Sequence, residues 1–182
     1  SSIMYGEIYY GNIRKSTNGG VSFPTQVCAS GSTGVNENGA WVTPYVLGSD
    51  PAHLYVGKTR VYKSTDNGAT FTSLAAFGTG VINALCVAPA NNNYIYASKG
   101  GTLFKSIDNG ATFSTVTGLP GNYITYICTN SSNAQEVYVS VSGFNSGVKV
   151  YKSTNAGTSW TNISGALPNI PANCIVYQTG SA

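Results

Sequence analysis

Few side chains in this sequence have the types and spacing that acid–base or nucleophilic chemistry requires. Hydrolysis of a glycosidic bond needs two carboxylates that face the same bond, and the 182 residues include only six acids. These are Glu7, Glu37, Asp50, Asp66, Asp108 and Glu136. Asp66 and Asp108 lie in two copies of one repeated segment, and Asp50 precedes a proline in a turn. Nothing in the spacing pairs the remaining acids, so we expect no catalysis within this chain.

The single histidine and the four cysteines also lack a reactive arrangement. A Ser-His-Asp set can be drawn around His53, but we interpret this residue as an exposed turn histidine. No Cys-x-x-Cys pair or histidine cluster is present, so we expect no metal site and no cofactor. Cys86 and Cys128 hold equivalent places in neighbouring repeats, which diverge too far for a disulfide, so buried free thiols are expected. Cys174 lies on a third such strand, and Cys28 has no assigned role.

The elements that position these residues are predicted to be strands and turns. Only 8% of the residues are Asp, Glu, Lys or Arg, against ~25% in an average soluble domain, and 22 Gly and 13 Tyr suit turns and pleated strands. Much of the net charge of +3 comes from one lysine in each repeat: Lys15, Lys63, Lys105 and Lys152. We interpret the densest basic cluster, around Lys58 and Arg60, as a solvated strand edge, so no nucleic-acid surface is expected. No apolar run approaches the ~20 residues of a membrane span, so no membrane insertion is expected.

One short segment occurs four times along the chain, as in VYKSTDNGATF at residues 61–71. Its final aromatic residues are spaced by 48, 42 and 47 residues, and a period in the forties in a strand-rich chain is typical of propeller blades of four strands each. Each copy holds a serine, an Asp or Asn, a glycine and an aromatic residue. The sixteen residues are Ser16, Asn18, Gly20, Phe23, Ser64, Asp66, Gly68, Phe71, Ser106, Asp108, Gly110, Phe113, Ser153, Asn155, Gly157 and Trp160.

The repeated segment has the chemistry of a hairpin turn. Its glycine suits a position with positive φ, and an Asp or Asn at the head of the turn accepts hydrogen bonds from backbone N–H groups. In the second copy, Ser64 and Thr70 can tie the two strands together, and Phe71 covers the turn. Asn18 and Asn155 replace the aspartate in two copies, which a catalytic or metal-binding carboxylate would not tolerate. We therefore interpret the segment as a structural joint.

The pattern Ser-x-Asp-x-Gly-x-Thr-Trp/Phe resembles the Asp-box, or bacterial neuraminidase repeat, of sialidases, sortilin-type receptors, xyloglucan-cleaving propellers and photosystem II assembly factors. Longer stretches such as residues 41–71 are most similar to blades of large secreted bacterial surface proteins. The resemblance covers nearly the whole chain and implies a β-propeller with Asp-boxes on peripheral turns, away from the central ligand face. It implies no reaction. A sialidase site needs three arginines, whereas this chain has only Arg14 and Arg60.

The repeat divides the chain into units at about residues 1–40, 41–80, 81–121 and 122–170, followed by residues 171–182. Each unit is predicted to hold four antiparallel strands, but the first begins at its second strand, IMYGEIYY, and the chain ends in a first strand, PANCIVYQTG. A closed four-blade ring and a window from a larger ring both fit this count. We favour the window, because Ser1 begins in mid-pattern and bulky residues such as Trp41 leave little room in a four-blade ring. The remaining blades then belong to a larger parent protein.

Aromatic residues near the first strands form the candidate ligand platform: Trp41, Tyr45, Tyr123 and Tyr126. They can hold a glycan at the central face, or they can pack between blades. We therefore expect a non-enzymatic β-propeller module that offers a binding surface to a glycan or a protein. The alternative is an accessory part of a glycoside hydrolase, xyloglucanase- or sialidase-like, whose catalytic residues lie outside the chain. The low charge and the family likeness favour an extracellular or cell-surface protein, secreted by a bacterium.

Overall fold

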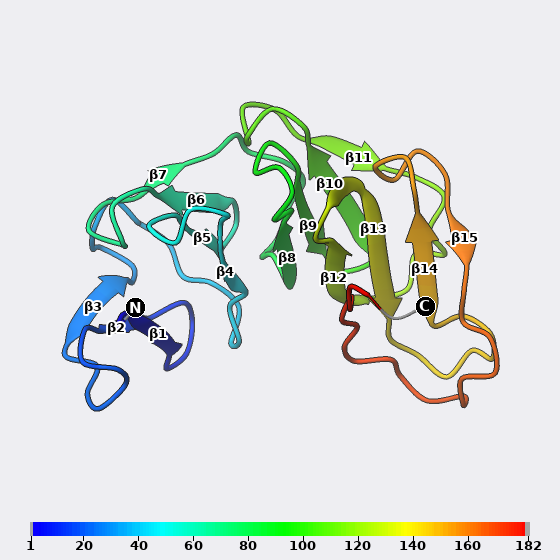
Figure 1. Ribbon diagram of the computed structural model, residues 1–182, viewed down its shortest axis with the longest axis horizontal. Helices are drawn as coiled ribbons and strands as arrows, with labels where there is room; N and C mark the ends of the chain where they lie inside the picture. Colours follow the sequence, from blue (N-terminus) through cyan, green and yellow to red (C-terminus); the bar gives the residue numbers. More distant parts are fainter. Residues whose placement is uncertain (1, 181–182) are drawn as a thin grey trace.

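All the regular secondary structure of the described residues is β-strand. The computed structural model describes residues 2–180, and these residues form four antiparallel sheets that follow one another along the chain (Figure 1). The described residues contain no helical segment of the length and apolarity that a membrane span requires. The architecture confirms the predicted all-β fold with propeller-type sheets.

Within each sheet the strands pair in chain order, and each strand is antiparallel to the next. The first sheet holds β1 (Met4–Glu7), β2 (Ile13–Ser16) and β3 (Thr25–Cys28). The second holds β4 (Tyr45–Leu47), β5 (Leu54–Gly57), β6 (Val61–Ser64) and β7 (Thr72–Ser73). The third holds β8 (Ala84–Val87), β9 (Ile95–Lys99), β10 (Thr102–Ser106) and β11 (Ser114–Val116). The fourth holds β12 (Ile124–Asn130), β13 (Asn133–Val141), β14 (Val150–Ser153) and β15 (Thr161–Asn162).

The sheets stand side by side in an open arc, with the first and the fourth at opposite ends (Figure 1). The inner strands meet near the centre of the arc, where β8 contacts both β4 and β12. Among the described residues no ladder joins the first sheet to the fourth. The structure is therefore a partial propeller.

The hydrophobic core lies between neighbouring sheets. Between the second and third sheets, for example, Tyr55 and Val61 pack in one cluster with Leu85, Ile95 and Phe104. Similar clusters join the first sheet to the second and the third to the fourth. Each sheet therefore buries its apolar residues against the next sheet, and a sheet at the end of the arc has one face without such a neighbour.

The prediction of a strand in residues 171–182 is wrong for the described residues, 171–180, which form no strand. A strand needs a partner for its backbone hydrogen bonds, and the described part of the chain supplies none here. The segment lies instead along the fourth sheet. Thr125 donates a hydrogen bond to the carbonyl of Ala172, and the rings of Tyr138 and Tyr177 lie 5.7 Å apart.

Candidate functional site

The four repeated segments form the loops that connect the last two strands of each sheet. In the second of these repeat loops, Ser64 Oγ donates to Asp66 Oδ1 at 2.7 Å and accepts from the backbone N–H of Gly68 at 2.8 Å. The Asp66 carboxylate also accepts from the Thr70 N–H at 2.9 Å and from the Thr70 hydroxyl at 2.6 Å. The Thr70 and Ser64 donors hold the pKa of Asp66 at about 2. The ionised carboxylate of Asp66 therefore serves to close the loop.

The other repeat loops use the same hydrogen bonds. The glycine N–H donates to the serine Oγ at 3.0, 2.8 and 2.8 Å in the first, third and fourth loops. Where aspartate becomes asparagine, threonine becomes serine: the amide of Asn155 donates to the Ser159 hydroxyl at 2.9 Å, so the direction of that bond reverses. Because an uncharged side chain closes the loop equally well, the geometry agrees with a structural joint.

Each repeat loop contains two consecutive residues with positive φ, and sequence reasoning predicted only one of them. Gly68 has φ of 81°, as its position in the hairpin requires. The residue before it, Asn67, also has φ of 56°, and Ala156 has 54° at the matching place in the fourth loop. The asparagine at this place in two copies was the available signal, because asparagine tolerates this conformation better than most residues.

The aromatic residue of the second, third and fourth repeat loops packs against the preceding sheet. Phe71 is only 5% exposed and shares a cluster with Ile13 and Val27 of the first sheet. Phe113 and Trp160 pack in the clusters that the third and fourth sheets share with the sheets before them. Phe23 is 37% exposed, because no described sheet precedes its own. The sequence predicted that Phe71 covers its own turn, and the structure adds that Phe71 is buried against the sheet before it.

The carboxylates outside the repeat loops are engaged with neighbouring donors. Glu7 accepts hydrogen bonds from the backbone N–H of Thr43 at 2.9 Å and of Gly11 at 2.9 Å. Glu37 accepts a hydrogen bond from the hydroxyl of Thr59. These contacts fix the connections between strands, and they give Glu7 and Glu37 structural roles.

His53 is half-buried, so its prediction as an exposed turn residue is wrong. Its backbone carbonyl closes the turn by accepting from Gly48 N–H at 2.9 Å. Nε2 lies 3.9 Å from Asp50 Oδ2, but Nδ1 is buried without a hydrogen-bond partner. No hydrogen bond joins this ring to a serine of the described residues, so the Ser-His-Asp set does not form there. Among the described residues, no group of three or more His, Cys, Asp or Glu side chains is placed to hold a metal ion.

The basic cluster is not a solvated edge, and the prediction is wrong for Lys58. Its side chain is fully buried and donates to the Glu37 carbonyl at 2.9 Å, and burial lowers its pKa. Arg60 and Lys63 are half-buried, and Lys63 reaches the side-chain oxygen of Asn109 at 3.1 Å. Connections between sheets leave oxygens without partners, and these lysines supply the donors.

All four cysteines are free thiols. Cys28 and Cys86 are buried, and burial raises their thiol pKa values to about 11 and about 12. The expectation of buried thiols does not hold for Cys128, which is half-buried, or for Cys174, which is exposed. Cys174 lies on the segment that runs along the end of the arc, where no further sheet covers it.

The predicted aromatic platform separates into parts. Tyr45 and Tyr126 line the same hollow, of about 260 Å³, between the inner strands β4 and β12. A second hollow of about 290 Å³ adjoins it and shares Tyr126 with it. Tyr123 is exposed and lines neither hollow. Trp41 lines neither hollow, although Val42, next to it in the chain, lines the first.

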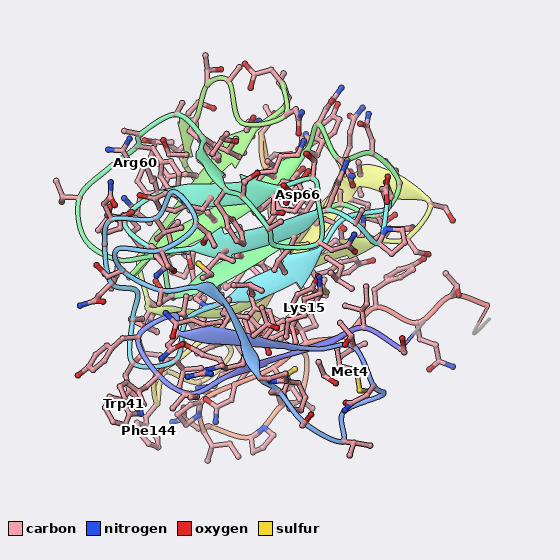
Figure 2. The ribbon with its side chains drawn as sticks, turned by 90° about the vertical axis from the view of Figure 1, so that its left-hand side faces the viewer. Met4, Lys15, Trp41, Arg60, Asp66 and Phe144 are labelled. Carbon is pink, nitrogen blue, oxygen red and sulfur yellow. The ribbon has the colours of Figure 1, made fainter. Side chains whose placement is uncertain are left out.

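Trp41 belongs to an exposed aromatic cluster that sequence reasoning missed. The Tyr9 and Trp41 rings are nearly parallel, with centroids 5.8 Å apart, and the Tyr10 ring meets the edge of Trp41 at 5.2 Å. Trp41 is 66% exposed, and both tyrosines are exposed as well. Figure 2 shows Trp41 at the rim of the molecule, well away from Asp66 of the second repeat loop.

The backbone beneath this cluster is held in place. The Tyr10 N–H donates to the Trp41 carbonyl at 3.3 Å, and the Gly39 N–H donates to the Tyr10 carbonyl at 3.0 Å. The Glu7 carboxylate joins the same two loops by accepting from Gly11 and Thr43. Three rings from two loops are therefore presented to solvent on a fixed frame. The sequence predicted Tyr9 and Tyr10 within the strand IMYGEIYY, but β1 ends at Glu7 and both tyrosines lie in the loop that follows it.

Comparison with known proteins identifies the fold. No family model matches the chain. No curated protein matches it either. Among solved structures, an ancestral GH74 enzyme is similar over 91% of this chain and 23% of its own, with 22% identity and a TM-score of 0.70. The GH74 xyloglucanase from Xanthomonas campestris is similar over 92% of this chain and 29% of its own, with 16% identity and a TM-score of 0.62.

A third similar structure is YCF48 bound to D1 peptide, over 82% of this chain and 45% of that one, with 16% identity and a TM-score of 0.53. The chain thus spans less than half the length of each of these structures. At such identities the likeness concerns the fold, which is that of a β-propeller.

Proposed function

We propose that this chain forms four Asp-box units of a larger extracellular β-propeller and that it binds glycans without catalysing a reaction on them. The Asp-box assignment is supported by four loops with one hydrogen-bond pattern, in which serine, Asp or Asn, and glycine hold the same positions. The open arc supports the larger ring, because both end sheets have a face without a neighbouring sheet.

The exposed cluster of Tyr9, Tyr10 and Trp41 carries the proposal of glycan binding. Sugar rings present apolar C–H faces with hydroxyl groups at their edges, and they suit flat aromatic rings that also carry polar atoms. Three large rings that stay exposed bury little apolar area, so they contribute little to the stability of the fold. Exposed apolar patches of this kind mark interaction sites. The adjoining hollows near Tyr45 and Tyr126 give a bound chain room to continue.

The absence of catalysis is supported by the roles of the acids. A glycosidase needs one protonated acid and one free carboxylate on either side of a bond. Here Asp66 and Asp108 close loops with pKa values of about 2, and Glu7 and Glu37 hold backbone and hydroxyl donors. Asp66 and Asp108 are therefore ionised near neutral pH and have no proton to give to a leaving group.

A glycan array with the folded chain, followed by calorimetry on the best oligosaccharide, tests this proposal. Trp41→Ala is expected to weaken binding about 30-fold, the order of an aromatic hot spot. Phe144→Ala is the matched control, because Phe144 is also an exposed aromatic residue but lies outside the cluster. Equal affinity of Trp41→Ala and the unaltered chain, or no glycan binding at all, would overturn the proposal.

The second candidate is an accessory part of a glycoside hydrolase, and the shared fold with GH74 enzymes favours it. The two candidates differ in whether the parent protein hydrolyses glycans, and in whether residues 1–182 take part in that hydrolysis. An activity screen of the complete parent protein on plant and mucin glycans separates them. Hydrolysis that a substitution within residues 1–182 abolishes, with folding intact, would contradict the non-enzymatic module.

A further inference from the structure

One hairpin of the first unit holds a bulky residue in a conformation that bulky residues rarely adopt. The loop between β1 and β2 turns at Tyr10 and Gly11, where the Asn12 N–H donates to the Tyr9 carbonyl at 3.0 Å. Tyr10 has φ of 53°, and Gly11 has φ of 73°. Two consecutive residues with positive φ are typical of a type I′ hairpin turn, which strongly favours Asn-Gly, Asp-Gly or Gly-Gly. Tyrosine at the first central position therefore strains the backbone.

The fold builds the same kind of hairpin elsewhere without a bulky residue. The strand pair before the third repeat loop, β9 and β10, is joined by Gly100 and Gly101, and Gly100 has φ of 63°. Asn67 and Asn109 also have positive φ, but asparagine tolerates this conformation. Among the described residues, Tyr10 is the one aromatic residue with positive φ. The presence of tyrosine in this turn therefore needs a reason other than the hairpin itself.

The Tyr10 side chain buries little apolar area that would stabilise the fold. It is 45% exposed, and the rings that it contacts, Tyr9 and Trp41, are exposed as well. Its backbone N–H and C=O bond to Trp41 and Gly39, but any residue at this position could make those two bonds. Strained residues cluster at functional sites, where the strain serves the function. The conformation of Tyr10 therefore points to a role in binding.

Contacts with the second unit hold this turn in place. A Cβ added to Gly11 would lie 2.9 Å from Lys58 Cε, so a larger residue would displace a buried side chain. Lys58 itself is tied down, because its Nζ donates to the Glu37 carbonyl at 2.9 Å. The Gly11 N–H donates to the Glu7 carboxylate at 2.9 Å. The Tyr10 ring therefore projects from a turn whose position is fixed.

The fixed turn sets the Tyr10 ring at right angles to two nearly parallel rings. The Tyr10 plane makes an angle of 88° with the Tyr9 plane and of 89° with the Trp41 plane, whereas the Tyr9 and Trp41 planes differ by 14°. A sugar ring that stacks flat on Trp41 or Tyr9 would meet the Tyr10 ring at its side. A hydroxyl group on that side then fits against Tyr10 or collides with it, according to its configuration. Perpendicular planes therefore test the shape of a ligand.

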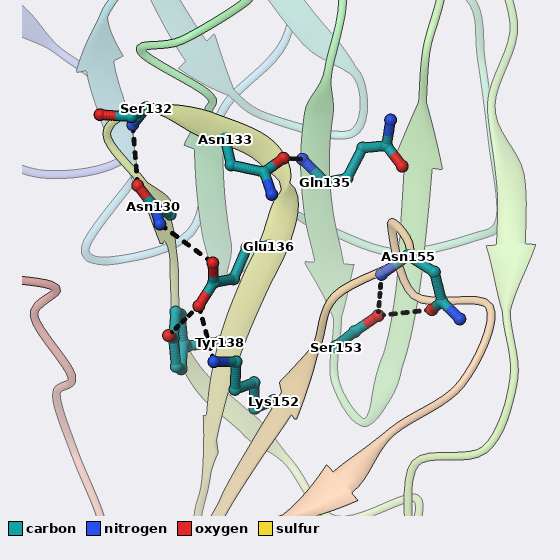
Figure 3. Close-up of polar contacts among 9 residues, drawn as sticks. All are labelled: Asn130, Ser132, Asn133, Gln135, Glu136, Tyr138, Lys152, Ser153 and Asn155. Atoms are coloured by element: carbon teal, nitrogen blue, oxygen red, sulfur yellow. Dashed lines mark hydrogen bonds and ion pairs between the residues drawn. The ribbon is translucent and has the colours of Figure 1, made fainter.

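The polar atoms of the three rings are available to a ligand. The hydroxyls of Tyr9 and Tyr10 and the indole N–H of Trp41 make no hydrogen bond to the described residues. By contrast, the hydroxyl of Tyr138 in the fourth sheet donates to the Glu136 carboxylate (Figure 3). Sugar hydroxyl groups both donate and accept hydrogen bonds, so they can pair with these phenol and indole groups. The cluster therefore offers flat apolar faces together with unengaged polar atoms.

From these observations we propose that Tyr10 is the specificity-determining residue of the glycan site. Its strained turn holds a perpendicular ring that selects sugars by the configuration of their hydroxyl groups. This rests on the proposed glycan binding, and it names the ligand more closely: a sugar ring with one flat apolar face toward Trp41 or Tyr9 and an edge hydroxyl that fits beside Tyr10. A ring that is fixed before binding loses little conformational freedom when the sugar binds, which favours affinity.

Two substitutions that both remove the ring test the strain in the turn. Tyr10→Asn supplies the residue that a type I′ turn favours, whereas Tyr10→Ala removes the same ring but tolerates positive φ poorly. The melting temperature of Tyr10→Asn, followed by circular dichroism, is expected to lie about 2–4 °C above that of Tyr10→Ala. Equal melting temperatures would show that the turn is not strained and would overturn the proposal. This comparison needs no ligand, so it is independent of the proposed glycan binding.

Calorimetry on the full chain, with the best oligosaccharide of the array and with the single-hydroxyl epimer that binds least, tests the selection. Tyr10→Asn is expected to weaken binding of the best oligosaccharide about 10-fold and to bring the ratio of the two affinities toward one. Tyr10→Phe is the matched control, because it keeps the ring, and it is expected to keep that ratio. An unchanged ratio in Tyr10→Asn would overturn this proposal while leaving glycan binding by Trp41 in place. No glycan binding by the unaltered chain would overturn the proposed function, and this proposal with it.

Discussion

Removal of one hydroxyl, in Ser64→Ala, tests whether the repeat loops are structural joints. Ser64 Oγ accepts the buried N–H of Gly68 at 2.8 Å, and a buried donor left without a partner costs roughly 1–3 kcal/mol. The second N–H that it accepts, from Asp66, is longer at 3.3 Å and lies in an exposed segment, where water can replace the hydroxyl. Asp66 keeps its two bonds from Thr70. We therefore expect a loss of about 2 kcal/mol in the free energy of unfolding.

Urea unfolding and thermal melting, both followed by circular dichroism, measure this loss. For a chain of this length, a loss of about 2 kcal/mol lowers the melting temperature by about 4–8 °C. Ser73→Ala is the matched control, because Ser73 lies on the exposed strand β7 of the same sheet. Its effect is expected to stay within about 0.5 kcal/mol.

Two results would refute the reasoning. If Ser64→Ala were as stable as Ser73→Ala, the hydroxyl would not hold the loop. If Ser64→Ala kept its stability but lost glycan binding, the loop would be part of a binding site instead of a joint. The expected outcome is the opposite: a less stable protein whose folded form binds glycans with unchanged affinity.

Two other predictions concern the same loops. The pKa values of Asp66 and Asp108 are about 2 in the folded chain, below the ordinary 3.8, so their ionised forms stabilise the fold above about pH 4 and this stability is lost as the pH falls toward about 2. Asp66→Asn/Asp108→Asn should therefore show a smaller fall in urea midpoint across that window, and a fall as steep as that of the unaltered chain would argue against it. Phe71→Ala should cost roughly 3–5 kcal/mol in urea unfolding and Phe23→Ala less than about 1 kcal/mol, because only Phe71 is packed between two sheets; equal costs would contradict this assignment.

The fold class and the repeat loops were predictable from the sequence because their causes are local. The spacing of the repeats sets the length of each unit, and the alternation of Val, Tyr and Lys in segments such as Val61–Ser64 sets the strands. The loop hydrogen bonds join residues at most four positions apart, as between Asp66 and Thr70. Serine, aspartate and glycine at fixed spacing were therefore enough to indicate a closed turn.

The candidate binding site depended on the tertiary structure. Tyr9 and Tyr10 join Trp41 only because the backbone of one loop hydrogen-bonds to another, and no spacing along the chain reports that contact. The same holds for Lys58, whose burial depends on a carbonyl in the preceding connection. Sequence reasoning named Trp41 but grouped it with the wrong aromatic residues.

The two ends of the arc show most clearly what the sequence determined and what it left to the tertiary structure. The sequence alone indicated that the first unit lacks an inner strand and that residues 171–182 have the pattern of one. It did not determine whether those residues pair, because a strand is defined by the hydrogen bonds of a neighbour and not by its own side chains. Likewise, Phe23 and Phe71 hold the same place in the repeat, but only Phe71 is buried, because burial depends on the sheet that stands on the other side.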